Sequence, residues 1–176
     1  LKQAGRKARL VSFPDYGTSI GEEIARALAG EREYGPDVMQ LLYVANRYEW
    51  KREIVRATES GTIVVCDRYL ASSVAYGEAQ GLDGAWLGEM QKYLPQPDLT
   101  FLLDIPPEVS ARRKTADRDK YERDLALLAR VRETAQTQSR HDGDAGVRKF
   151  SHRVHRRVPA GCESRCNKAQ FWHGRV

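Results

Sequence analysis

The sequence predicts an α/β protein in which helices flank a parallel β-sheet. Residues 62–66 (TIVVC) and 99–103 (LTFLL) are continuous apolar runs without polar alternation, which is typical of strands buried on both faces of a parallel sheet. An aspartate follows each run at once, and segments with helical periodicity lie between the runs. Ligands of such sheets bind beyond the carboxyl ends of the strands, so we expect a site near Asp15, Asp67 and Asp104.

Length and composition fit one globular domain that lies outside membranes. The chain has 176 residues, of which 41% are hydrophobic and 30% charged, and no apolar run approaches the ~18 residues that cross a bilayer. Three cysteines are too few for a disulfide framework, and Cys66 lies within an apolar run. These features predict a cytoplasmic protein without a membrane partner.

The excess of basic charge is confined to one end of the sequence. The formal net charge is +5, but residues 1–137 contain 20 Lys and Arg against 21 Asp and Glu, whereas residues 138–176 contain 9 against 3. This division predicts a nearly neutral domain at 1–137 and a basic tail at 138–176. Nucleic acid is not expected as a partner, because charge without aromatic or groove-reading context is a weak signal.

The first strand and the first helix are predicted from local signals. Residues 8–13 (ARLVSF) are β-prone and end at Pro14, which lacks the backbone N–H that a sheet needs. Ser19 and Glu22 have the spacing of a capping box, and apolar residues then recur on one helical face until Gly30. We therefore expect a strand, a loop and a helix in this order.

Three further helices are predicted after the first. One opens near Asp37 and ends at Gly61, a second starts at Pro106, and a third covers residues 121–133 (YERDLALLARVRE). Beyond the last helix the periodicity stops, and no strand of useful length is evident. We therefore expect residues 138–176 to stay outside the sheet, as a disordered or frameshifted segment.

The pair Asp67-Arg68 stands directly after a buried strand, and this placement suits a phosphate site. A guanidinium grips phosphate oxygens in a fork, while the neighbouring carboxylate orients a Mg²⁺ shell or the arginine itself. The alternative is a structural ion pair at the strand end. A ligand with several phosphates is favoured over an ion pair, because the nearly neutral domain contains further cations. These are Arg47 and a basic cluster of Arg112, Arg113 and Arg118.

Five segments in a fixed order resemble the thymidylate kinases, which are nucleoside monophosphate kinases of the P-loop class. The segments are FPDYGTSIGEEI from Phe13, LLYVANRYE from Leu41, CDRYLASSVAYG from Cys66, PDLTFLLDIPPE from Pro97 and DKYERD from Asp119. The resemblance covers about residues 2–137. It implies a P-loop NTPase-like fold and transfer of the ATP γ-phosphoryl group to dTMP, which gives dTDP and ADP and leads to dTTP.

For the acceptor nucleotide, the resemblance implies a pocket with a defined set of contacts. Phe13 stacks on the thymine ring, Ser73 lines the base pocket, and Tyr16 lies near the acceptor phosphate. Arg47 hydrogen-bonds the base or the ribose-phosphate side, and Tyr76 packs against deoxyribose and disfavours a 2′-hydroxyl. Taken alone, Phe13 and Tyr76 also fit a hydrophobic core. Tyr16 and Arg47 also fit an ordinary loop and a solvated helix surface.

For the transfer step, the resemblance implies a set of charged residues around the phosphates. Arg68 holds the acceptor phosphate, and Asp67 and Glu122 belong to the Mg²⁺ shell. Asp119 and Glu122 orient magnesium-bound water or the acceptor, and Tyr121 packs beside the nucleotide. A mobile lid closes over ATP and neutralises developing charge with cations whose alternative is a solvated helix surface: Arg112, Arg113 and Arg118.

The sequence departs from the family's pattern at its start. The 176 residues contain no G-x-x-x-x-G-K-[ST] loop, whose backbone amides and lysine hold the phosphates of ATP. We therefore expect no ATP binding, a gap in the sheet and an inactive fragment of a homodimeric enzyme. The alternatives are another nucleoside monophosphate kinase, or a nucleotide-binding module without catalytic activity.

Overall fold

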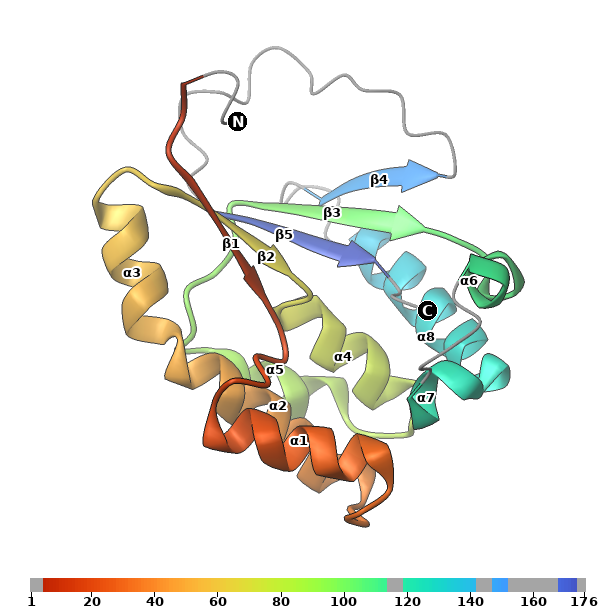
Figure 1. The fold of residues 1–176 in the computed structure, drawn as a ribbon. Helices are drawn as coiled ribbons and strands as arrows, with labels where there is room; N and C mark the ends of the chain where they lie inside the picture. Colours follow the sequence, from red (N-terminus) through yellow and green to blue (C-terminus); the bar gives the residue numbers. More distant parts are fainter. Residues whose placement is uncertain (1–4, 114–118, 142–146, 152–167, 174–176) are drawn as a thin grey trace.

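The computed structural model describes residues 5–113, 119–141, 147–151 and 168–173. A parallel sheet with packed helices (Figure 1) confirms the predicted fold class. The strands are β1 (Ala8–Ser12), β2 (Ile63–Asp67), β3 (Leu99–Asp104), β4 (Val147–Ser151) and β5 (Lys168–His173). The helices are α1 (Ser19–Ala29), α2 (Pro36–Glu49), α3 (Lys51–Glu59), α4 (Leu70–Glu78), α5 (Gly84–Gln91), α6 (Pro107–Arg113), α7 (Lys120–Arg123) and α8 (Leu125–His141).

The strand order of the described sheet is β1-β2-β5-β3-β4, and every neighbouring pair is parallel. In the register of β1 and β2, Ser12 pairs with Asp67, so the two strands end level with each other. Phe13 extends this pairing, because its backbone N–H donates to the Asp67 carbonyl at 2.9 Å. The carboxyl ends of β1 and β2 therefore form one edge, and β1 points from there toward α1 and α2 (Figure 1).

Two strands of the sheet come from the tail, and the prediction that residues 138–176 contain no strand is wrong. β5 pairs with β2 on one side and with β3 on the other, while β4 extends the sheet beyond β3. The expected gap beside β2 is therefore occupied by residues 168–173. The physical reason is that the facing edges of β2 and β3 carry peptide groups that need partners, and a strand between them satisfies both edges.

Helix boundaries differ from the predictions at single residues. Thr18, not Ser19, caps α1, because its hydroxyl accepts the Gly21 N–H at 3.0 Å. The apolar stripe predicted as one helix is divided at Trp50 into α2 and α3. Asp124 likewise separates α7 from α8, and its carboxylate accepts the Leu127 N–H at 2.9 Å. At Trp50 and Asp124 the helix therefore breaks although the apolar periodicity continues through it.

Three hydrophobic clusters pack the helices against the sheet and against one another. The first joins α4, β3 and α8, the second joins β1, β2 and α3, and the third joins α1 to α2. Their central members are Ala75, Leu102 and Val131; Val11, Ile54 and Val64; and Ile24, Ala27 and Met39. Among the described helices, none combines the length and the apolar character that crossing a membrane requires.

Candidate nucleotide-binding site

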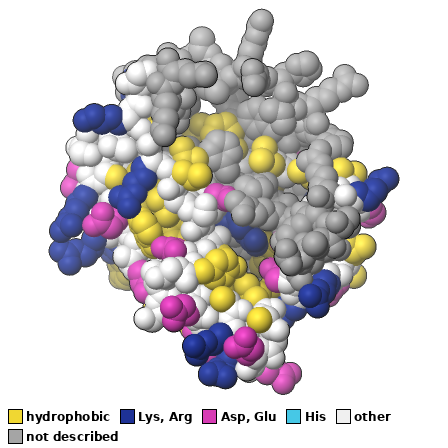
Figure 2. Space-filling model, viewed as in Figure 1, with side chains coloured by type: hydrophobic (Ala, Val, Ile, Leu, Met, Phe, Trp, Pro, Cys, Tyr) yellow, Lys and Arg dark blue, Asp and Glu magenta, His cyan; other side chains and the backbone are white. Residues whose placement is uncertain are grey.

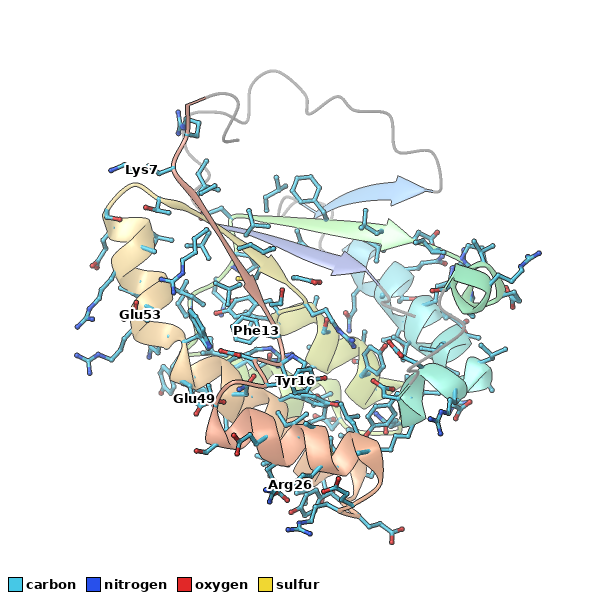
Figure 3. The ribbon with its side chains drawn as sticks, in the orientation of Figure 1. Lys7, Phe13, Tyr16, Arg26, Glu49 and Glu53 are labelled. Carbon is cyan, nitrogen blue, oxygen red and sulfur yellow. The ribbon has the colours of Figure 1, made fainter. Side chains whose placement is uncertain are left out.

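One pocket opens between the loop after β1, the start of α4, helix α2 and helix α7. The loop contributes Phe13 and Tyr16, which lie close together beyond the end of β1 (Figure 3). A wider cleft adjoins the pocket, and Arg68 lines both. The two hollows therefore meet at the carboxyl end of β2, where the rule for parallel sheets predicts a ligand.

Arg47 forms the deep end of this pocket. Its side chain comes from α2 and is only 4% exposed, and one guanidinium N–H donates to Ser73 Oγ at 2.6 Å. Gln91 Oε1 lies 3.5 Å from the same nitrogen, while Nε of Arg47 has no partner among the described residues. Burial lowers the pKa of Arg47 to about 10, so the group stays charged at neutral pH. Arg47 is therefore a buried cation whose hydrogen-bond acceptors, among the residues that the structure describes, are neutral.

Arg68 stands at the mouth of the pocket in an unusual backbone conformation. Its φ is 60°, the left-handed region that non-glycine residues rarely adopt. The guanidinium lies over the Tyr76 ring, 4.9 Å from the centroid. Removal from water opposes the charged form, but Tyr76, Tyr43 and Asp119 outweigh this effect and raise the pKa of Arg68. The strained turn at the end of β2 thus directs a stable cation into the site.

Aromatic side chains form the walls between these two cations. Phe13 is 4% exposed and packs against Tyr69 with ring centroids 5.5 Å apart. Tyr76 and Tyr121 meet edge to face at 6.2 Å. Burial raises the pKa of Tyr121 to about 12, and it also raises the pKa of Tyr43, so both hydroxyls stay neutral. The pocket thereby combines apolar ring faces with neutral hydrogen-bonding groups.

Asp119 and Glu122 have a structural role at the acidic side of the site. Asp119 Oδ1 accepts the backbone N–H groups of Tyr121 and Glu122 at 2.8 Å each, and Glu122 Oε2 accepts the Asp119 N–H at 3.2 Å. This reciprocal capping box fixes the start of α7. Both residues line the pocket and the adjoining cleft, so α7 carries its carboxylates to the junction of the two hollows.

The cleft has carboxylates among its described lining residues, and carboxylate oxygens are of the type that binds Mg²⁺. In the part of the chain that the structure describes, no three His, Cys, Asp or Glu side chains form a metal-binding group. Mg²⁺ commonly takes only one or two protein carboxylates, and phosphate oxygens and water complete its octahedron. Asp67 and Glu122 line the same cleft and supply two such oxygen donors.

The charge distribution suits an anionic ring compound. Within the described residues, neither Arg47 nor Arg68 takes part in an ion pair. Elsewhere, basic and acidic side chains are interspersed over the described part of the face in Figure 2, so charge of one sign does not gather there. An anion therefore gains most from the pocket itself, where two cations face aromatic walls.

Comparison with known proteins identifies the family. The family model for thymidylate kinase matches residues 1–153. The chain belongs to the thymidylate kinase family. The thymidylate kinase of Schizosaccharomyces pombe is 35% identical over 117 residues, which are 66% of this chain and 56% of that protein. The thymidylate kinase of Thermomicrobium roseum is 42% identical over 122 residues, 66% of this chain and 57% of that protein.

A solved thymidylate kinase structure, from Candida albicans, has the same fold. It superimposes with a TM-score of 0.70 at 28% sequence identity, covering 82% of this chain and 71% of that one. The chain spans about half the length of the curated relatives that it matches. The resemblance seen in the sequence motifs is thus confirmed at the level of the family and of its parallel α/β fold.

The structure brings most of the predicted thymidylate kinase site residues together. The residues that line the pocket are Phe13, Tyr16, Arg47, Arg68, Ser73, Tyr76, Asp119, Tyr121 and Glu122. Asp67 lines the adjoining cleft and is 6% exposed. Tyr16 is 48% exposed, so it forms the outer rim of the pocket.

Of the predicted lid arginines, the structure places only the side chain of Arg112. Arg112 is exposed on α6, where its Nε donates to the Glu108 carbonyl at 3.3 Å, and it lines neither hollow. The side chain of Arg113 and the whole of Arg118 lie outside the described residues. Their role at ATP remains a prediction from the family resemblance.

Sequence reasoning missed five residues that line the pocket: the apolar Pro14 and Leu28, and the hydrogen-bonding Gln40, Tyr43 and Ser72. A signal for Gln40 and Tyr43 is present in the sequence. Positions 40, 43 and 47 have the i, i+3, i+7 spacing of one helical face, so the face that carries Arg47 also carries a glutamine and a tyrosine. Ser72 precedes Ser73 in α4, and its hydroxyl has no partner within the described structure.

Proposed function

We propose that this chain provides the acceptor site of a thymidylate kinase, which transfers the ATP γ-phosphoryl group to dTMP and gives dTDP and ADP. The observation that carries the proposal is the pair of guanidinium groups, Arg47 and Arg68, that face one aromatic pocket without an ion-pair partner among the described residues. A nucleoside monophosphate supplies both the ring and the anion that this arrangement accommodates.

The relative depth of the two arginines supports one orientation of dTMP. Arg47 lines only the inner pocket, whereas Arg68 lines the pocket and the adjoining cleft. The thymine ring accordingly enters between Phe13 and the tyrosines and accepts hydrogen bonds from Arg47. Its phosphate binds Arg68 at the junction, where a phosphoryl donor can approach from the cleft. Catalysis then comes from positioning and charge neutralisation, which is what phosphoryl transfer requires.

Specific roles follow from this orientation. Ser73 accepts from Arg47, so its own hydroxyl proton is free to donate to a base oxygen. Tyr76 packs beside the sugar and keeps Arg68 in place, and Tyr16 covers the outer side of the phosphate. Tyr121 lines the pocket from α7, the helix that Asp119 caps.

The donor side of the proposal rests on the family. Asp67 and Glu122 would hold Mg²⁺ at the cleft, and when bound the ion neutralises charge on the phosphates. Arg112, Arg113 and Arg118 would supply cations at the ATP phosphates. Because the 176 residues contain no G-x-x-x-x-G-K-[ST] loop, we expect this chain alone to bind dTMP without turnover.

Titration calorimetry tests the acceptor site without ATP. dTMP should bind at least about tenfold more tightly than dGMP, whose larger ring does not fit a pyrimidine pocket, and thymidine should bind weakly because it has no phosphate for Arg68. Equal affinity for dTMP and dGMP would contradict the proposal. ADP release with dTMP, ATP and Mg²⁺ should be absent, and clear release would contradict the role given to the missing loop.

The proposal includes a homodimer in the cytoplasm. On α2, Val38 and Leu41 are 37% and 48% exposed, which leaves an apolar face available to a second copy. Sedimentation should show a dimer that L41E converts to a monomer, and a monomeric wild type would contradict this part. A reducing compartment is consistent with Cys66, a buried free thiol.

A further inference from the structure

The loop that carries Phe13 and Tyr16 is held by Asn46, the residue directly before Arg47. The Asn46 side chain is fully buried, and its Oδ1 accepts the Asp15 backbone N–H at 2.8 Å. Its Nδ2 lies within donating distance of the Asp15 carbonyl at 3.1 Å and of Thr18 Oγ1 at 2.9 Å. One side chain therefore satisfies both backbone groups of Asp15, as a neighbouring strand would.

A second side chain holds the same loop from the junction of α2 and α3. The indole N–H of Trp50 donates to Asp15 Oδ2 at 2.8 Å, and Asp15 Oδ1 accepts the Gly17 N–H at 3.0 Å. The Trp50 ring is itself fixed, because the Arg9 guanidinium stacks over it at 5.0 Å. Both carboxylate oxygens of Asp15 are thus used to shape the loop.

Helix α1 also packs against this loop, and the contact is made at Gly21. A Cβ atom at Gly21 would lie 1.8 Å from the Asp15 carbonyl oxygen and 2.8 Å from Tyr16 Cα. Only glycine permits the loop backbone to come this close to the helix. Thr18 adds a further tie, since its hydroxyl donates to Glu49 Oε2 at 2.7 Å, and Figure 3 shows Glu49 of α2 near this loop.

We propose that Asn46, Trp50 and Gly21 are positioning residues for the nucleotide acceptor site. They line neither hollow, but they fix the loop that carries Phe13 and Tyr16 relative to Arg47. The inference rests on the proposed function for the identity of the ligand. The loop geometry is independent of the ligand's identity.

Two small substitutions test the inference, each with a matched control elsewhere in the chain. Trp50→Phe removes one donor and keeps an aromatic ring, and it should weaken dTMP binding about 3- to 10-fold, as expected for one lost hydrogen bond to a carboxylate. Gly21→Ala forces the loop away from α1 and should weaken binding by more than about tenfold. The controls are Trp86→Phe on α5 and Gly88→Ala, where an added Cβ meets nothing within 4 Å.

Amide hydrogen exchange separates positioning from general destabilisation. In Trp50→Phe, exchange at residues 15–18 should accelerate, while β2 and the rest of α2 keep their wild-type rates. If Gly21→Ala fails to fold, Trp50→Phe alone carries the test. Unchanged dTMP affinity in Trp50→Phe overturns the inference, as does unchanged exchange at residues 15–18.

The outcome with wild-type protein distinguishes the two proposals. If the wild type and the Trp50→Phe variant bind dTMP equally well, the positioning role is contradicted and the proposed function is not. A wild type that does not bind dTMP contradicts the proposed function, and the positioning role for a nucleotide falls with it.

Discussion

Ser73→Ala tests the central feature of the pocket, the buried Arg47, whose hydrogen-bond partners in the described part of the chain are neutral. Ser73 is 1% exposed, and its hydroxyl accepts from Arg47 at 2.6 Å. After the substitution, the same guanidinium nitrogen keeps only Gln91 Oε1 at 3.5 Å. A buried cation then loses its shortest hydrogen bond, and water cannot readily replace it.

The expected cost follows from the type of bond removed. A hydrogen bond to a charged group contributes about 1.5–3 kcal/mol, so the free energy of unfolding should fall by that amount. For a chain of this size, the melting temperature should drop by about 3–12 °C. Added dTMP should raise the melting temperature of the variant, because it binds only the folded state.

Ser72→Ala is the matched control for this prediction. Ser72 is 4% exposed, and its hydroxyl has no partner within the described structure, so its removal should leave stability unchanged or raise it. Urea unfolding followed by circular dichroism measures both variants. If Ser73→Ala costs no more than Ser72→Ala, the Arg47–Ser73 contact does not hold the arginine and the reasoning is wrong.

Three further predictions concern other contacts. Tyr76→Leu should weaken dTMP binding about 3- to 10-fold by removing the ring beneath Arg68, whereas Tyr76→Phe should not; equal calorimetric affinities of the two variants would contradict this. Arg132→Met should lower the free energy of unfolding by about 1–2 kcal/mol, because a two-pronged contact at 2.6 and 3.3 Å with the nearly buried Asp104 is lost; an unchanged urea midpoint would refute it. Burial raises the pKa of Cys66 from 9.0 to about 12, so native protein at pH 8 should resist alkylation until urea is added, as peptide mass spectrometry can show. The unfolded chain loses this thiol proton first, so the contribution of Cys66 to stability should decline as the pH rises from about 9 to about 12.

Strand cores and the location of the site could be predicted from the sequence because both depend on local chemistry. The apolar runs at 62–66 and 99–103 became β2 and β3 almost residue for residue. The aspartate that follows each run could be assigned to one edge, since parallel strands end on the same side of the sheet. Arg47 was assigned to a helix, but the sequence gives no indication that its hydrogen-bond partners among the described residues are Ser73 and Gln91.

The helix breaks could not be predicted because periodicity alone does not contain them. The apolar stripe that ends at Val55 continues through Trp50, yet α2 stops there, and Trp50 instead binds Asp15. The periodicity of residues 121–133 likewise runs through Asp124, whose carboxylate caps α8. In both cases a tertiary or capping contact outweighs propensity, and only the folded chain reveals it.

The fifth strand illustrates a different limit of sequence reasoning. Residues 168–173 have no periodicity that distinguishes them from the surrounding basic tail, but they pair with the facing edges of both β2 and β3, whose peptide groups would otherwise lack strand partners. A segment in that position is selected by its partners and needs only to be extended and free of proline. Phe171 pairs with Asp67, so β5 lies beside the last residue of β2 and continues past it to His173. The backbone at the carboxyl end of β2 is therefore paired with a segment far along the chain, which local sequence patterns do not encode.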